Sequence, residues 1–252
     1  MPLHLQILLP LFTLALGHGF GQVSYTGLAF GLVYAFWVLA APKLPARLWF
    51  PVTLLASIAF AAHLVPGFSP LPLAEPLRLS PDAPPYALRL SWDKTLVGMA
   101  LLAWWLGRTV PTIAPRWRAT AVTAAATLLA VPALALGLDL VDWMPKWPEL
   151  VWRWLPVNLL AVVLAEELVF RGLLQGALVS RLGTWAGITI TALLFGAVHL
   201  PFSPLFAAVA TVAGLGYGLA FHFSGRLGVA MALHMAVNLC HLALLSYPVK
   251  LG

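Results

Sequence analysis

Long apolar runs separated by short polar connections form the main pattern along this chain. A helix of about 20 apolar residues, with a range of roughly 17–25, crosses the hydrocarbon core of a bilayer. Strict alternation of apolar and polar residues, as expected for barrel strands, is absent. The pattern predicts candidate spans at 3–18, 24–41, 48–65, 94–108, 118–138, 152–180, 184–200, 204–223 and 227–247.

These runs predict helices, because backbone groups in lipid must find their hydrogen-bond partners within the segment itself. The run at 94–108 is short, so the pattern is compatible with either eight or nine spans. The run at 3–18 lacks the basic start and the A-x-A cleavage site of a signal peptide, and we interpret it as a retained span. The predicted fold is an all-α polytopic transmembrane helix bundle of eight or nine spans.

The connections between these runs predict the orientation. Segment 66–93 holds seven prolines, which cannot continue a helix, so we expect an interfacial loop there. The connection at 139–150 is mostly acidic, whereas four basic connections lie together on the opposite side and are marked by Lys43 and Arg47, by Arg108, Arg116 and Arg118, by Arg181, and by Arg226. Lys and Arg mark the cytoplasmic side of a membrane protein. The pattern therefore places 139–150 outside and the N-terminus in the cytoplasm.

Composition excludes several classes of protein. Of the 252 residues, 62% are hydrophobic and only 9% are charged, against about 25% charged residues in soluble domains. A soluble enzyme could not cover its surface with so few charges. The net charge of +6 is explained by Lys and Arg beside spans, so the expected partner is the lipid bilayer and not nucleic acid. The single cysteine, Cys240, excludes a disulfide-rich scaffold.

Polar residues at mid-membrane depth concentrate in the last four spans. We therefore predict N-terminal scaffold helices over 1–148 and a functional part over 149–252. Glu166 and Glu167 are adjacent in one apolar run, where each charge costs about 2.5–3.5 kcal/mol. Glu167 and Arg171 are four apart and can form an ion pair. Glu166 points about 100° away, toward a predicted polar cavity.

Two further polar faces follow on separate spans. His199 ends one apolar helix, with Phe195 one turn earlier on the same face. His234 and Asn238 share a face of the last helix. Taken singly, these side chains are explained by an interfacial position or by helix-to-helix hydrogen bonds. Together with Glu166 they could activate water and stabilise an oxyanion, as carbonyl hydrolysis requires.

Other mechanisms have weaker support in the sequence. Neither an H-E-x-x-H nor a G-x-S-x-G motif is present. The run from Gly214 to Gly218 does not match a nucleotide loop and predicts close helix packing instead. With the spans above, His199 lies near the non-cytoplasmic end of its helix. His234 lies about 10 Å from the cytoplasmic end of its own, at 1.5 Å per residue, so the two depths conflict.

The ordered motifs resemble those of the CPBP family, the CAAX protease and bacteriocin-processing (ABI) family of intramembrane endopeptidases. That family carries E-E-x-x-x-R, then F-x-x-x-H, then H-x-x-x-N or H-x-x-x-D on separate spans. Here these are Glu166-Glu-Leu-Val-Phe-Arg171, Phe195-Gly-Ala-Val-His199 and His234-Met-Ala-Val-Asn238. All three occur in order over about residues 150–247, whereas the N-terminal half carries no motif.

The resemblance implies hydrolysis of a peptide bond in a membrane-associated protein or peptide, of CAAX, C-terminal-tail or bacteriocin type. By analogy, Glu166 activates the water, His199 assists it, and His234 with Asn238 stabilises the oxyanion. Glu167, Arg171 and Phe195 support the site. A metal-free glutamic mechanism is favoured and no cofactor is expected, although Glu166, His199 and His234 could bind zinc.

Two other hypotheses remain open at this stage. A non-catalytic immunity or scaffold protein of the same fold would be expected to carry degraded motifs, and a proton-coupled transporter would be expected to show repeated halves or broken helices. The compact size and the lack of a targeting extension favour a multi-pass protein of the bacterial inner membrane.

Overall fold

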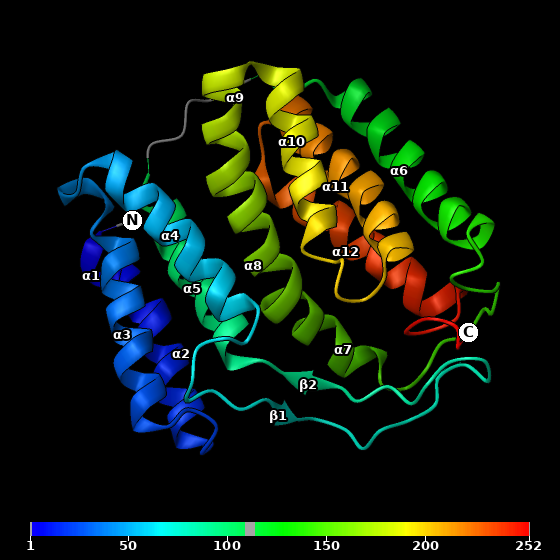
Figure 1. Ribbon diagram of the computed structural model, residues 1–252, viewed down its shortest axis with the longest axis horizontal. Coiled ribbons are helices and arrows are strands. Elements are labelled where there is room, and N and C mark those ends of the chain that lie inside the picture. Colours follow the sequence, from blue (N-terminus) through cyan, green and yellow to red (C-terminus); the bar gives the residue numbers. More distant parts are fainter. Residues whose placement is uncertain (1, 109–113, 252) are drawn as a thin grey trace. The chain divides into compact units, whose positions relative to one another are not determined.

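Helices make up most of the computed structural model, which describes residues 2–108 and 114–251 (Figure 1). Every run predicted as a span is mainly helical, although the first is divided into two helices and the run at 152–180 into alternating α- and π-helical segments. The all-α class is therefore confirmed. The helices are α1 (Leu3–Gln6), α2 (Leu8–Gly19), α3 (Tyr25–Leu39), α4 (Ala46–Ala61), α5 (Trp92–Leu106), α6 (Trp117–Gly137), α7 (Val151–Val157), α8 (Leu164–Glu167), α9 (Gly176–Leu182), α10 (Thr184–Ala197), α11 (Pro204–Ser224) and α12 (Leu227–Leu244), with a 3-10 turn η1 (Ala41–Lys43).

The helical stretch that carries the two adjacent glutamates is not a uniform α-helix. Two π-helical segments, η2 (Asn158–Val163) and η3 (Leu168–Gln175), interrupt it on either side of α8. A π-helical turn contains an extra residue and often occurs at functional sites. Glu166 and Glu167 therefore lie in one short α-helical turn between two wider segments, which the apolar pattern did not predict.

The long proline-rich connection has more order than the expected loop. Strand β1 (Leu71–Pro72) pairs antiparallel with β2 (Arg89–Leu90), with Leu71 opposite Leu90. The sequence analysis predicted no strand here, because a ladder of two residues per strand is too short to show alternation. In Figure 1 both strands lie at the bottom of the view, within the connection between α4 and α5.

Three helices among the described residues are long and apolar enough to cross a bilayer, namely α6, α11 and α12. Four shorter apolar helical segments of 10–17 residues accompany them. The predicted count of eight or nine spans is therefore not confirmed. Large apolar side chains lie exposed on α6, where Val122 is 69% and Leu129 is 73% exposed. Such a surface is more stable in lipid than in water.

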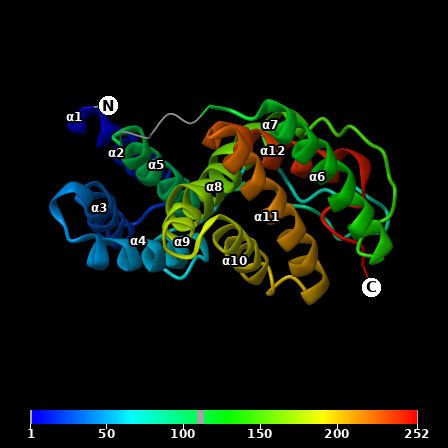
Figure 2. The ribbon, with the colours of Figure 1, turned by 90° about the horizontal axis from the view of Figure 1, so that it is seen from above.

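The helices gather into two compact units. The first contains the described residues of 1–73, 89–111 and 155–173, and the second those of 74–88, 112–154 and 174–252. In the first unit, α5 packs against α2, α3, α4 and α8. In the second, α11 packs against α6, α10 and α12, as both views show (Figures 1 and 2). The predicted functional division at residue 148 remains a prediction.

A polar cluster joins the segments that follow α6 and α12 in the second unit. The Lys146 ammonium donates to the carbonyl oxygens of Met144 and Leu245. Burial lowers the pKa of Lys146, and the negative charge of Asp82 opposes this shift. Ser246 donates its hydroxyl to Asp82, and its backbone N–H donates to the carbonyl of Asp142 at 2.9 Å. These bonds fix the non-helical segments beside the ends of α6 and α12.

Glycines allow α11 to approach its neighbours closely. A Cβ atom added at Gly214 would lie 3.0 Å from the Phe195 ring, and one at Gly216 would overlap the Thr127 hydroxyl. Small residues at helix contacts let the backbones approach in a membrane bundle. The close packing predicted for the run from Gly214 to Gly218 is therefore confirmed.

Gly216→Ala should destabilise the second unit by about 1–3 kcal/mol, because the added methyl group overpacks the contact with Thr127. Gly228→Ala is the matched control, since a Cβ atom there meets nothing within 4 Å. We expect the control to be neutral or slightly stabilising, because alanine favours a helix over glycine. Thermal unfolding in detergent measures both variants, and equal midpoints would contradict the packing argument.

Candidate active site

The second of the adjacent glutamates forms the ion pair that the sequence predicts. The Arg171 guanidinium lies 2.9 Å from Glu167 Oε1, and both side chains are 0% exposed. The contact persists although Arg171 belongs to the π-helical segment η3. Two opposite charges buried side by side favour one rotamer for each side chain, so this pair fixes the helix around the acidic turn.

Glu166 lies on another side of the same turn and faces α5. The Lys94 ammonium is 3.7 Å from Glu166 Oε1, and the side chains are 25% and 15% exposed, respectively. Both residues belong to the first unit. The motif spacing predicts no partner for Glu166 on its own helix, and the structure places a cation from a neighbouring helix beside it.

His199 is held by the helix that precedes it. Its Nδ1 atom lies 2.7 Å from the carbonyl oxygen of Phe195. A carbonyl oxygen can only accept a hydrogen bond, so the ring donates from Nδ1. In the neutral imidazole, Nε2 then carries the lone pair. His199 is thus oriented with one nitrogen able to accept a proton or a hydrogen bond.

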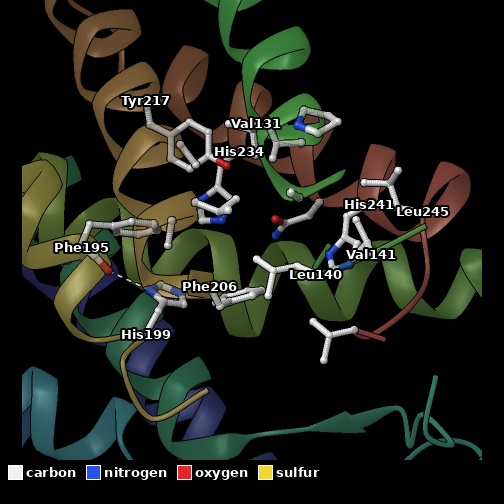
Figure 3. A pocket seen from close by; sticks show the side chains of 18 residues that line it. Val131, Leu140, Val141, Phe195, His199, Phe206, Tyr217, His234, His241 and Leu245 are labelled. Carbon is white, nitrogen blue, oxygen red and sulfur yellow. Dashed lines mark hydrogen bonds between the residues drawn. The ribbon is translucent and has the colours of Figure 1, made fainter. Parts of the chain in front are cut away.

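His234 is packed between two aromatic rings. Tyr217 stacks on it with ring centroids 4.5 Å apart and an interplanar angle of 15°. Phe195 meets it edge-on at 5.9 Å and also contacts the ring of His199 at 5.0 Å. Figure 3 shows Phe195 to one side of both histidine rings, with Tyr217 beside His234. Phe195 therefore connects the predicted histidine motifs by packing.

One cavity in the second unit brings several candidate residues together (Figure 3). It has a volume of about 100 Å³, and its walls are mostly apolar. Its polar lining consists of His199, Tyr217, His234, Asn238 and His241. Four of the predicted site residues, Phe195, His199, His234 and Asn238, thus line a single space. The remaining three, Glu166, Glu167 and Arg171, lie in the first unit.

The conflict between the depths of His199 and His234 does not arise in the structure. Helix α10 contains only 14 residues, which is about 21 Å at 1.5 Å per residue, less than the hydrocarbon thickness of about 30 Å. His199 and His234 line the same cavity. The Phe195 ring contacts the rings of both histidines.

Three residues near these groups were not identified as site residues from the sequence. Lys94 begins a short apolar run, and a cation at such a place is usually interfacial. Tyr217 lies within the glycine run, and the sequence around it does not predict a contact with His234. His241 was seen only as a continuation of the face of His234 and Asn238. Each reaches its place through contacts between helices, which local sequence does not encode.

A bound zinc ion needs three or four converging His, Cys, Asp or Glu ligands. Among residues 2–108 and 114–251, no group of three or more His, Cys, Asp or Glu side chains is arranged to hold a metal ion. The Nε2 atom of His199 has the chemistry of a zinc ligand, because its Nδ1 is occupied by a carbonyl. Zinc binding through Glu166, His199 and His234 stays a prediction.

Arg171→Leu should lower the stability of the protein by about 3–5 kcal/mol, because it leaves the fully buried Glu167 charge without its guanidinium. Adding Glu167→Gln to this variant should restore part of the loss, since the uncompensated charge disappears. Arg181→Leu, an exposed arginine of the same helical stretch, serves as the control. Thermal unfolding in detergent is the measurement, and an Arg171→Leu midpoint equal to that of the control would disprove the structural role.

Comparison with known proteins bears on the region that carries these residues. The family model described as Rce1-like, Type II CAAX prenyl endopeptidase, matches residues 147–240. No curated protein and no solved structure matches the chain. The matched region contains every candidate residue of the three motifs, Glu166, Glu167, Arg171, Phe195, His199, His234 and Asn238. Residues 147–240 thus match the Rce1-like branch of the CPBP family, and the resemblance predicted from the motifs is confirmed over this region.

Proposed function

We propose that the protein is an intramembrane endopeptidase that hydrolyses a peptide bond of a membrane-associated protein or peptide. The observation that carries this proposal is the shared cavity of His199, His234 and Asn238 within the region that matches a prenyl endopeptidase family. A mostly apolar cavity with a few convergent polar groups is the usual form of a small active site.

The proposed mechanism assigns one task to each side chain. Glu166 accepts a proton from the attacking water, and His199, oriented through Nδ1, assists with the lone pair on Nε2. His234 and Asn238 donate hydrogen bonds to the oxyanion that forms as water attacks the carbonyl. The protonated groups then return a proton to the leaving amine. Glu167 and Arg171 hold the acidic turn in place.

We propose that the reaction proceeds without a metal, because a carboxylate base and oxyanion donors supply what hydrolysis requires. The substrate would be a CAAX-type protein, a C-terminal tail or a bacteriocin-like peptide, and the apolar walls of the cavity suit an apolar side chain or lipid group. The proposed location is the inner membrane of a bacterium. The competing proposal is a non-catalytic immunity or scaffold protein of the same fold.

Glu166→Gln should reduce kcat by a factor of about 10²–10⁴, the range expected for loss of a general base. The assay uses the purified protein in detergent and an internally quenched peptide that ends in a farnesylated cysteine followed by three residues. The same peptide with an unmodified cysteine tests whether the lipid is needed. Glu149→Gln is the control, since Glu149 is exposed and lies outside the motifs.

The outcomes of this assay separate the proposals. Wild-type cleavage together with an inactive Glu166→Gln variant and an active Glu149→Gln variant supports the endopeptidase. Cleavage by Glu166→Gln at the wild-type rate would refute Glu166 as the base. Absence of cleavage of either peptide by the folded wild-type protein would favour the non-catalytic alternative.

Removal of metal tests the second part of the mechanism. We expect the chelated protein to cleave the farnesylated peptide at the wild-type rate, because the proposed base is a carboxylate and not a metal-bound hydroxide. Elemental analysis of the same sample verifies that zinc is gone. Loss of activity that returns on addition of zinc would instead assign Glu166, His199 and His234 as ligands.

A further inference from the structure

Lys94 lies in the first turn of α5, within the unit that also contains Glu166. Its ammonium is 3.7 Å from Glu166 Oε1, and neither side chain is more than 25% exposed. A lysine at the end of an apolar helix usually extends its charge toward the membrane surface. Here the charge lies against the carboxylate that is the proposed base, so an interfacial anchor does not account for the contact.

The backbone around Lys94 is fixed by a second set of polar contacts. The N–H of Lys94 donates to Asp93 Oδ1 at 2.8 Å. Asp93 Oδ2 lies 2.7 Å from Nδ1 of His63, and the Asp93 side chain is only 5% exposed. Asp93 thereby holds the start of α5 to the end of α4, where His63 adopts a positive φ of 60°. The position of Lys94 along the helix is thus set independently of its own side chain.

Close packing brings α5 to the acidic turn. A Cβ atom added at Gly98, one turn after Lys94, would lie 3.2 Å from the Leu164 side chain and 3.4 Å from the backbone nitrogen of Ala165. These residues immediately precede Glu166 in α8. The glycine therefore lets α5 approach α8 at the point where the ammonium and the carboxylate face each other.

The adjacent acids have different cations beside them. Arg171 lies on Glu167 within the same helical stretch, whereas Lys94 reaches Glu166 from another helix. The contact between the Lys94 ammonium and Glu166 Oε1 restricts the rotation of the carboxylate, because a charged partner on a neighbouring helix favours one orientation of the side chain.

We propose that Lys94 is a positioning residue for the hydrolysis, which holds the Glu166 carboxylate oriented toward the water. Lys94 itself does not contact the substrate. This inference rests on the proposed function, because it assigns a role toward the proposed base.

Lys94→Met tests the role of the charge, and Lys94→Arg tests whether another cation replaces it. With the farnesylated quenched peptide, we expect Lys94→Met to lower kcat by about 10–100-fold, below the full effect of losing the base. KM should stay within about 2-fold, because binding of the peptide is unchanged when only transition-state interactions are lost. Lys94→Arg should restore most of kcat. Lys43→Met, which removes an exposed lysine of the same unit, should behave as wild type.

Thermal unfolding of Lys94→Met, Glu166→Gln and the double variant provides a readout that does not depend on activity. The two changes should be non-additive, because each removes the same ion pair. Additive effects on the unfolding midpoint would overturn the contact and with it the proposal. Wild-type kcat in Lys94→Met would do the same, as would a loss of activity explained entirely by a smaller folded fraction.

These outcomes are distinguishable from failure of the proposed function. If Glu166→Gln is inactive and Lys94→Met cleaves at the wild-type rate, the endopeptidase stands and the role of Lys94 is rejected. If the folded wild-type protein cleaves no peptide, or Glu166→Gln cleaves at the wild-type rate, the proposed function fails and the inference about Lys94 falls with it.

Discussion

Polar side chains placed among apolar helices need partners from the protein, because lipid supplies neither hydrogen bonds nor screening. The arrangement of the candidate site follows from this constraint. Glu167 is paired with Arg171, Glu166 lies beside Lys94, and the imidazole of His199 is bonded to the carbonyl of Phe195. Each partner also restricts the orientation of the group it satisfies. The same contacts that offset the cost of polar burial therefore also orient the side chains of the candidate site.

Small residues make these partnerships geometrically possible. Gly98 allows α5 to reach the turn that carries Glu166, and Gly214 allows α11 to reach Phe195. Gly218 likewise allows the Gln175 side chain to approach α11, since a Cβ atom there would lie 2.8 Å from the amide oxygen of Gln175. The amide nitrogen of Gln175 donates to the Gly218 carbonyl at 3.0 Å. The glycines therefore bring the helix backbones close together and also bring buried polar groups within hydrogen-bond distance.

The apolar pattern was sufficient to predict the helices, and i,i+4 spacing was sufficient to predict the pair of Glu167 and Arg171, because both depend on residues that are near in the chain. The apolar pattern was not sufficient to predict the number of membrane crossings. Helix length decides whether a segment spans, and several apolar helices are shorter than a full crossing. The π-helical segments around α8 also gave no signal, since an extra residue in a turn leaves the hydrophobic composition unchanged.

By itself, the sequence determined the helical class, the apolar surface and the ordered motifs that lead to the family match at residues 147–240. Only the tertiary structure decided that Lys94 lies on Glu166, that Tyr217 stacks on His234, and that His199, His234 and Asn238 share a cavity. The physical reason is the separation of these residues along the chain. Contacts between helices depend on crossing geometry and on the small residues at each crossing. A sequence motif shows only which side chains a helix carries and not which of them meet.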